Sequence, residues 1–365
     1  MVSRAFLSHS EIQEIVVHTG QHYDSNLSEI FFAELGIPQP AFNLGIGSGA
    51  HGCQTARMLE AIEQVLLQER PEWVLVYGDT NSTLAGALAA AKLQVPLAHI
   101  EAGLRSFNRK MPEEINRVLT DHASDLLFSP TDHAVRNLLL EGIGEEKIRL
   151  VGDVMYDAAR HYQLLAERQS TILDRLGLEP KEYVLVTVHR AENTDSSDRL
   201  QTILCGFQEA ALGLPVIFPL HPRTRNVLAN QEGFTRLSEP VRFINPLGYL
   251  DMMMLERSAR LIVTDSGGVQ KEAFFASVPC VTLRTETEWR ELIEMGWNRL
   301  APPTSSSAVA FALQQALTET PHTTGNPYGD GRAAERVAQY LLGSRADTQQ
   351  ESVLASSVSP AKAVN

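Results

Sequence analysis

The chain has 365 residues, of which 44% are hydrophobic, and a formal net charge of −13. This length is too great for one compact core of ordinary size and favours two domains. The acidic balance, with no cluster of Lys and Arg to offset it, argues against nucleic acid or an anionic membrane as a partner. No apolar run reaches the roughly 20 residues of a membrane span, and residues 1–30 carry no signal-peptide pattern, so we expect a cytoplasmic protein.

The amino terminus departs from the ordinary pattern of a doubly wound domain, which opens with a strand, a tight loop and a helix. Here residues 2–9 read as the end of a helix that leads directly into a strand. The first strand of such a domain lies in the middle of its sheet. Without it, neighbouring strands keep unpaired backbone groups, each costing about 1 to 3 kcal/mol when buried. We therefore expect either a misassigned start or a compromised first domain.

Residues 11–160 alternate buried strand patterns with helical ones. Short apolar runs predict strands, and segments with a period close to 3.6 residues predict helices. This order implies parallel strands joined by right-handed crossovers. The predicted strands are 14–18, 73–77, 97–100, 126–129 and 148–151, and the predicted helices are 25–35, 52–68, 82–93, 112–122 and 132–141.

A second alternating series follows the polar helical stretch 160–176, which marks the boundary between domains. Two similar halves facing across a cleft are the simplest arrangement, so the predicted fold class is α/β with two Rossmann-like, doubly wound domains. We place the domains at 1–160 and 161–342 and expect a disordered tail at 343–365, which has no periodicity. The second series of predicted strands comprises 183–188, 214–219, 241–244, 261–264 and 278–283.

Acidic residues follow two predicted strands of the first domain. Asp79 ends the strand 73–77, and Glu101 ends the next, with Glu113 in the segment beyond. Open α/β sheets bind ligands at the carboxyl edge of their strands, and converging carboxylates there suit proton transfer. The alternative is that Asp79 caps the following helix and Glu101 pairs with Arg105. Residues alone leave both interpretations open.

A strand, a glycine turn and a helix start meet at Ser266, Gly267 and Gly268. Accessible backbone amides, a hydroxyl and the helix dipole favour a phosphate at this position. Glu272, one turn into the helix, has two oxygens suited to the two hydroxyls of a ribose. The alternative is a structural strand-to-helix turn with a serine cap, which recurs throughout α/β folds.

Basic loops follow the first two strands of the second domain. His189 and Arg190 end the first of these strands, and His221 and Arg223 follow the next. Their donors suit a phosphate or a leaving-group oxygen. A lone histidine at a strand end is more often structural, but two basic loops and a glycine turn at one edge indicate an anion site.

The polar loop 18–24 carries two histidines, with Gln21 and His22 at its centre. It lacks an obvious third ligand, so we favour a ligand-contacting loop over a metal site. The three cysteines, Cys53, Cys205 and Cys280, are widely spaced and form no C-x-x-C pair, which argues against both disulfides and a cysteine-built metal site. We therefore predict no metal.

Eight short strings, taken in order, resemble the non-hydrolysing UDP-N-acetylglucosamine 2-epimerase family. Each string is weak, but the ordered set is specific, and the likeness is collinear from about residue 11 to residue 342. The resemblance implies the glycosyltransferase-B fold, with UDP held by the second domain and the sugar facing the first. The strings are 19–22, 78–80, 99–105, 112–117, 189–190, 264–272, 286–290 and 326–331.

The resemblance also implies roles for individual residues. Its acid/base carboxylates match Asp79, Glu101 and Glu113, and the histidine near the diphosphate matches His189. The UDP-binding motif matches Ser266, Gly267, Gly268 and Glu272, and a second, regulatory UDP-sugar contact matches the loop of Gln21 and His22. The family mechanism is anti elimination of UDP to a 2-acetamidoglucal and re-addition to the opposite face. It uses no cofactor and implies a homodimer.

Two departures from the family pattern bear on function. The opening strand and its Gly-Thr-Arg-Pro loop have no counterpart before Val2, and the segment 106–111 is shorter than in some members. The leading hypothesis is an epimerase that interconverts UDP-GlcNAc and UDP-ManNAc for cell-envelope polysaccharide synthesis. The alternatives are a UDP-sugar glycosyltransferase and a UDP-sugar-binding protein that is inactive through loss of the first strand.

Overall fold

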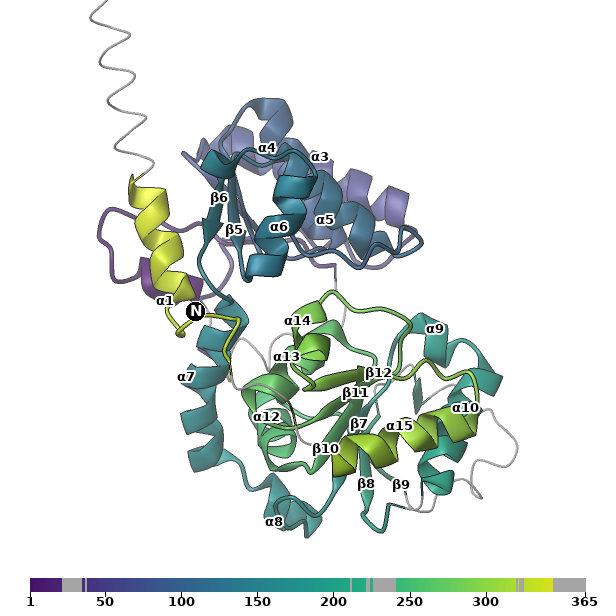
Figure 1. Ribbon diagram of the computed structural model, residues 1–365. Coiled ribbons are helices and arrows are strands. Elements are labelled where there is room, and N and C mark those ends of the chain that lie inside the picture. The colour runs from purple at the N-terminus through teal and green to yellow at the C-terminus, as the bar shows by residue number, and fades with distance from the viewer. Residues whose placement is uncertain are drawn as a thin grey trace, which may run out of the picture.

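The computed structural model (Figure 1) describes residues 1–21, 35–36, 38–210, 212–220, 224–225, 241–319, 321 and 325–343. It consists of two halves, each built on parallel strands with helices packed on them (Figure 1). The elements of the first half are α1 (Val2–Phe6), β1 (Val17–His18), β2 (Phe42–Asn43), α3 (His51–Glu69), β3 (Val74–Tyr77), α4 (Asn81–Leu93), β4 (Leu97–Ile100), α5 (Pro112–Ala123), β5 (Leu126–Ser129), α6 (Asp132–Leu140), the 3-10 helix η1 (Glu145–Lys147) and β6 (Ile148–Leu150).

The second half follows α7 (Val154–Gln169), which runs alongside the junction of the two halves (Figure 1). Its elements are α8 (Ile172–Leu176), β7 (Val184–Thr187), α9 (Ala191–Thr194), α10 (Ser197–Glu209), β8 (Val216–Pro219), β9 (Val241–Ile244), α12 (Tyr249–Ser258), β10 (Leu261–Thr264), α13 (Gly267–Phe275), β11 (Cys280–Thr282), α14 (Arg290–Glu294), β12 (Asn298–Leu300) and α15 (Ser306–Thr318). Residues 333–343 are also helical.

The sheet of the second half is doubly wound. Its six strands are all parallel and have the order β12-β11-β10-β7-β8-β9. The strand order reverses between β7 and β10, which are hydrogen-bonded neighbours. In such sheets the crevice at the reversal point, beyond the carboxyl ends of the strands, is where ligands bind.

The first half has its strands in two separate groups. Strands β3-β4-β5-β6 form one parallel sheet, and β1 and β2 form a parallel pair. Within the described residues, β3 pairs with β4 alone and β1 with β2 alone. Strand β3 is only partly buried, whereas all four residues of β4 and of β5 are buried. Among the described residues, no strand pairs with β3 on the side away from β4.

Apolar side chains pack on both faces of each sheet. In the second half, one cluster lies beneath α10 and α15, and another lies beneath α8, α12 and α13. In the first half, α3 and α4 cover one face, and the other face contacts α1 through Val2 and Phe6. Each sheet is therefore a rigid platform, and its strand ends hold loop residues in place.

The carboxyl-terminal helical segment returns to the first half. Ala334, Val337 and Ala338 are buried against Ile100 and Phe128 of the first sheet. Chain segments from both ends of the sequence thus contribute to one core. The domain bounds given above, 1–160 and 161–342, stay a prediction. The predicted tail falls outside the described residues apart from residue 343.

The predicted elements agree closely with the observed ones in the well-buried regions. Strands β3 to β11 all fall at or within predicted positions, apart from shifts of a residue or so at their ends. The short strands β2 and β12 have two and three residues and were not predicted, because so few residues carry no periodic signal. The predicted helix 25–35 lies outside the described residues except at its last position.

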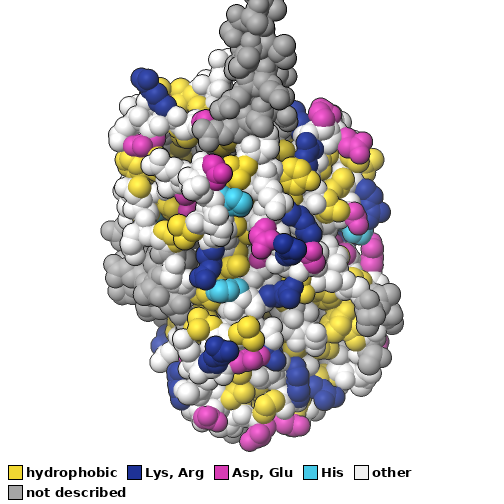
Figure 2. All heavy atoms as spheres, turned by 90° about the vertical axis from the view of Figure 1, so that its left-hand side faces the viewer, with side chains coloured by type: hydrophobic (Ala, Val, Ile, Leu, Met, Phe, Trp, Pro, Cys, Tyr) yellow, Lys and Arg dark blue, Asp and Glu magenta, His cyan; other side chains and the backbone are white. Residues whose placement is uncertain are grey.

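The surface shows no segregation of charge on the face presented in Figure 2, where acidic and basic side chains are interspersed among the described residues. Among those residues, no helix is both long enough and apolar enough to cross a membrane.

Candidate active site

The loops after β7 and β10 are joined by one buried carboxylate. Asp265, fully buried, accepts hydrogen bonds from the backbone N–H groups of His189 and Arg190, each at 3.1 Å, and from the Asn193 side chain at 2.9 Å. The His189 Nδ1 lies 3.6 Å from Asp265, while its side chain is 45% exposed. Asp265 therefore fixes the backbone of the basic loop and leaves the imidazole facing solvent.

The same strand end leads into the glycine turn at the start of α13. Ser266 is the N-cap, and its hydroxyl accepts from the N–H of Val269 at 3.5 Å. Gly267 and Gly268 form the first helical positions and are partly exposed. Since a Cβ at Gly267 would find its nearest neighbour at 4.0 Å, the space beside the first turn is open. Partly exposed amides at a helix start suit an anion.

Glu272 lies one turn further along α13. Burial raises the pKa of its carboxyl group to about 7, with the Lys271 ammonium acting in the opposite direction. The neighbouring carboxyl of Glu256 is buried, and burial together with the charge of Glu272 raises its pKa well above the ordinary value. Two carboxyl groups in one buried region disfavour double ionisation.

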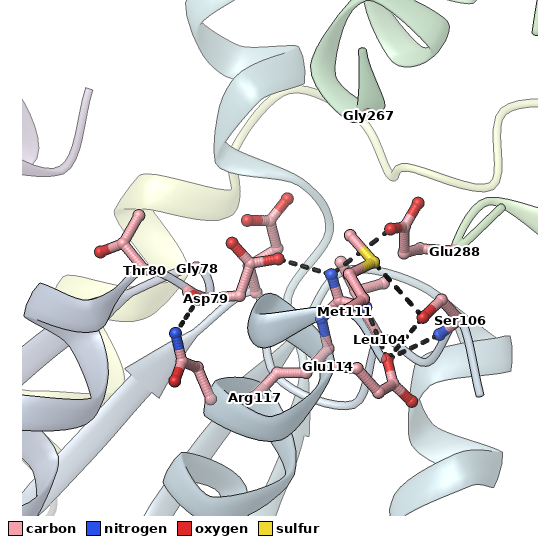
Figure 3. Close-up of polar contacts among 12 residues, drawn as sticks. Gly78, Asp79, Thr80, Leu104, Ser106, Met111, Glu114, Arg117, Gly267 and Glu288 are labelled. Atoms are coloured by element: carbon pink, nitrogen blue, oxygen red, sulfur yellow. Dashed lines mark hydrogen bonds and ion pairs between the residues drawn. The ribbon is translucent and has the colours of Figure 1, made fainter. Parts of the chain in front are cut away.

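Asp79 leaves the carboxyl end of β3 and points toward the second half (Figure 3). Its Oδ2 accepts a 2.6 Å hydrogen bond from Arg117 of α5, and its side chain is 32% exposed. The cap of α4 is Thr80, whose hydroxyl and that of Thr83 bond reciprocally to the backbone N–H groups. The alternative that Asp79 serves as the cap is therefore wrong.

Glu101 leaves the carboxyl end of β4 with a positive φ of 74°. Its Oε1 accepts a 2.8 Å hydrogen bond from Lys271 of α13, in the other half of the molecule. Burial raises the pKa of Glu101, and the charges of Asp153 and Asp79 add to this, against the opposing effect of Lys271. The alternative pairing of Glu101 with Arg105 is wrong as well.

Arg105 belongs to a buried scaffold beneath these acids. Its guanidinium donates to Asp121 at 2.7 Å and to both oxygens of Glu141 at 2.7 Å. Asp121 also accepts from the His99 ring at 2.7 Å, and the other ring nitrogen lies 2.8 Å from the Gly78 carbonyl oxygen. The scaffold therefore positions the turn that presents Asp79.

The third predicted acid, Glu113, is partly exposed in the first turn of α5. Its neighbour Glu114 is buried and holds the loop before α5, accepting from the backbone N–H groups of Ser106 and Phe107 at 2.9 Å each. Glu114 also accepts from Arg117 at 2.8 Å. The two adjacent glutamates thus have different environments, and only Glu113 keeps its carboxylate partly open to solvent.

A chain of charged side chains crosses between the halves. Arg117 lies between Asp79 and Glu288 (Figure 3), with 3.4 Å separating its NH2 from Glu288 Oε1. Arg284 donates to both oxygens of Glu288, at 3.1 and 3.0 Å. Burial acts to raise the pKa of Glu288, but the guanidinium groups of Arg284 and Arg117 outweigh it and lower that pKa to about 2.

These geometries bring carboxylates of the first half close to α13 of the second half, the helix that begins at the glycine turn. Residues 4–342 match the family model for UDP-N-acetylglucosamine 2-epimerase. The chain belongs to this family. Both the recognition of the family from sequence and the prediction of a glycosyltransferase-B fold are confirmed.

Relatives within and around this epimerase family cover nearly the whole chain. A UDP-N-acetylglucosamine 2-epimerase homolog of Methanococcus maripaludis is 50% identical over 93% of this chain and 94% of its own. The UDP-2,3-diacetamido-2,3-dideoxy-D-glucuronate 2-epimerase of Pseudomonas aeruginosa is 51% identical over 93% of this chain and 94% of its own. The UDP-GlcNAc 2-epimerase of Methanocaldococcus jannaschii, solved with UDP-GlcNAc and UDP, superposes with a TM-score of 0.87 at 46% identity, covering 93% and 94% of the two chains.

Four predicted ligand-contacting residues of this epimerase family member are not seen next to the glycine turn. One of them contacts the start of α4, and the other three lie outside the described residues. Gln21 is described, and its side-chain oxygen accepts from the N–H and hydroxyl of Ser82 at 3.1 and 2.7 Å, beside the start of α4. His22, His221 and Arg223 lie outside the described residues. Among the described residues, no group of three or more His, Cys, Asp or Glu side chains is arranged to hold a metal ion.

Sequence reasoning missed several charged residues that lie where the two halves meet. Arg117 and Glu288 stand inside the strings 112–117 and 286–290 that carry the family resemblance, and Lys271 stands inside 264–272. Each was visible as a charge within such a string, which was the available signal. Its partner lies far away in sequence, so no local spacing identified the contact.

Proposed function

We propose that the chain inverts C2 of UDP-N-acetylglucosamine to give UDP-N-acetylmannosamine, by elimination and re-addition of UDP. The observation that carries this proposal is the 2.8 Å contact between Glu101 and helix α13, the helix that begins at the glycine turn. It brings a candidate base of the first half next to a candidate phosphate site of the second. Abstraction of a proton and departure of a diphosphate need these two functions within one substrate length.

The acid/base group consists of Asp79, Glu101 and Glu113. In the elimination step, a carboxylate removes the proton from C2, the C1–C2 double bond forms, and the bond from C1 to the UDP oxygen breaks. The C2 proton of the sugar is weakly acidic, so a base of raised pKa in a desolvated setting is favourable. Burial supplies that environment for Glu101. In the second step, a proton reaches C2 from the opposite face and the UDP oxygen bonds to C1 again.

The departing UDP requires charge stabilisation on the second half. His189, Arg190 and the amides of Gly267 and Gly268 supply donors at the strand-order reversal, with Ser266 beside them. Preorganised donors aimed at developing charge contribute strongly to catalysis. In this proposal Glu272, one turn into the same helix, accepts hydrogen bonds from the ribose. His221 and Arg223 belong to the same proposed binding set.

The remaining parts of the proposal concern setting and assembly. The reaction needs no cofactor, because the electrons of the broken C–H bond stay in the sugar. We propose a cytoplasmic homodimer that feeds cell-envelope polysaccharide synthesis, with Gln21 and His22 contributing to a regulatory UDP-sugar contact.

A second substrate is favoured by one specific observation. The Pseudomonas aeruginosa relative, whose name specifies a 2,3-diacetamido-2,3-dideoxyglucuronate, is as similar to this chain as the Methanococcus maripaludis relative, at 51% against 50% identity. Both substrates undergo the same inversion at C2. They differ at C3 and C6 of the sugar, so the proposed chemistry is unchanged.

Incubation with each UDP-sugar in deuterated water tests the proposal. We expect deuterium at C2 of the substrate and of its C2 epimer. The UDP-sugar with the higher kcat/KM is the preferred substrate. Unlabelled product rules out the elimination mechanism. Release of UDP only when an acceptor is added indicates a glycosyltransferase instead, and binding measured by calorimetry without conversion indicates a binding protein.

A further inference from the structure

Lys271 is fully buried on α13, between the glycine turn and Glu272. Its Nζ donates to Glu101 Oε1 at 2.8 Å and to Asp153 Oδ2 at 2.7 Å. The same Nζ lies 4.1 Å from the centroid of the Trp289 ring. A buried ammonium is strongly unfavourable unless it is paired, and here two carboxylates and an aromatic face surround it.

Both acidic partners of Lys271 belong to the first half or to its exit. Glu101 follows β4, and Asp153 stands between β6 and α7. The other oxygen of Asp153, Oδ1, accepts from the N–H of Met155 at 2.7 Å and caps α7. Asp153 is thus held in place by its own helix, and Lys271 connects that fixed point to Glu101. The contact exists only when the two halves are as close as they are here.

The side chain of Glu101 has few alternative orientations while it accepts the hydrogen bond from Lys271. Its backbone is in the left-handed region, with a φ of 74°. Its second oxygen, Oε2, lies beside Gly78. A Cβ atom added to Gly78 would be 3.2 Å from this oxygen. Lys271 holds Oε1, and so Oε2 is left at the turn that presents Asp79.

We propose that Lys271 is a positioning residue of the second half that orients Glu101 of the first half and opposes its protonation when the two halves lie together. The inference rests on the proposed function, in which Glu101 is a proton-transfer group. It adds a role for Lys271, because this residue lies on α13, the helix that begins at the glycine turn proposed to bind phosphate.

The charges around Glu101 set the direction of this effect. Burial raises the pKa of Glu101, Lys271 lowers it, and Asp153 and Asp79 raise it. Burial and the charge of Glu291 raise the pKa of the Tyr328 hydroxyl, and the charges of Asp153 and Glu101 add to this effect. Lys271 therefore opposes the combined effect of burial and of the two neighbouring carboxylates on Glu101.

Two substitutions are expected to act in opposite directions on the pH dependence of turnover. Lys271→Met removes the ammonium, so the acidic limb of the kcat/KM profile moves to higher pH by about one unit or more, and kcat/KM at pH values well below the limb falls about tenfold. Asp153→Asn removes a repelling carboxylate while an asparagine still caps α7, so the limb moves to lower pH. A merely structural role for Lys271 predicts loss of folded protein without such opposed shifts.

The experiment measures C2 deuterium exchange from pH 5 to 9 for both variants, the wild type and Lys92→Met, which changes an exposed lysine of α4. Opposed shifts with an unmoved control support the inference. Limbs that stay in place, or that move in the same direction, overturn it. If Lys271→Met does not fold, Asp153→Asn decides alone, by a downward shift or its absence. A wild type without exchange overturns the proposed function as well, whereas exchange with unmoved limbs overturns this inference alone.

Discussion

Arg117 donates to Asp79 at 2.6 Å from within the first half and lies 3.4 Å from Glu288 of the second half. One guanidinium therefore joins a proposed acid/base residue of the first half to Glu288 of the second half. Arg117 itself is buried, and burial opposes its charge, while the charges of Asp79 and Glu288 raise its pKa. The side chain that orients Asp79 thus also contacts the second half.

Asp79→Asn tests the role of this carboxylate in proton transfer. We expect kcat to fall by about 10² to 10⁴-fold, which is the usual contribution of a general acid or base. UDP affinity, measured by calorimetry, stays at the wild-type level because the proposed UDP site lies in the second half. Asp174→Asn, at an exposed position of α8, serves as the matched control. A kcat within a factor of about three of wild type removes Asp79 from the mechanism.

Glu288→Gln tests the ion-pair network through the pH dependence of stability. The folded pKa of Glu288 is about 2, below the ordinary 4.5, so its ionisation stabilises the fold above pH 4.5, and this contribution is lost as the pH falls toward 2. We expect the variant to be less stable than wild type by about 2 to 3 kcal/mol at pH 7, on the basis of 1.36 kcal/mol per pKa unit.

Urea unfolding at pH 7, 4 and 3 measures this difference, which should narrow progressively below pH 4.5. Glu60→Gln, an exposed residue of α3, is the control. A difference that is constant over this pH range means that the lost stability comes from packing and not from ionisation of Glu288.

Glu272→Gln has the opposite pH signature. The pKa of Glu272 is raised from 4.5 to about 7, so the wild type loses stability as the pH rises between these values and the partly buried carboxyl must ionise. Glutamine avoids this cost. We expect the variant to gain on the wild type by about 1 to 2 kcal/mol between pH 4.5 and pH 8, an amount reduced from the full shift because the side chain is partly exposed.

Thermal unfolding at several pH values follows this gain, with Glu60→Gln again as the control. A stability difference that does not grow with pH shows that Glu272 ionises at an ordinary pKa. Since Glu272 is also proposed to contact the ribose, UDP affinity of the variant should fall at every pH tested.

Thr80→Ala tests whether the Thr80 side chain stabilises α4 as its N-cap. The Thr80 hydroxyl bonds the N–H of Thr83 at 3.4 Å. Loss of an N-cap side chain costs about 1 kcal/mol, and we expect a fall in the midpoint of thermal unfolding of about 2 to 4 °C. Thr80→Ser keeps the hydroxyl and should behave as wild type. Equal losses from both variants would show that the methyl group, rather than the cap, stabilises this turn.

Much of the fold follows from local pattern. The apolar runs of β4 and β10 are buried at every position, and such runs predict central parallel strands in any α/β chain. Their alternation with helices then determines parallel pairing and the common carboxyl edge. For this reason Asp79, Glu101 and Ser266 could be predicted at the cleft from their positions after strands.

The partners of these residues could not be predicted in the same way. Glu101 has Arg105 four positions away, but it pairs with Lys271, and Arg105 instead pairs with Asp121 and Glu141. Charged pairs of this kind have no preferred sequence spacing, because their geometry is set by how whole elements pack. Similarly, the distinction between the adjacent Glu113 and Glu114 is a matter of which side of α5 faces the loop before it.

The sequence by itself determined the α/β class, the two series of strands, the family, and the acids and glycine turn at strand ends, because burial and backbone pairing impose regular periods on residues. Only the tertiary structure decided which charges meet across the cleft. Lys271 lies 170 positions from Glu101, and the bond between them forms because two sheets bring their loops within 2.8 Å. Charged groups that are removed from water interact more strongly, and an unpaired buried charge is costly. Removal from water depends on how the elements pack and not on the spacing of residues in the sequence.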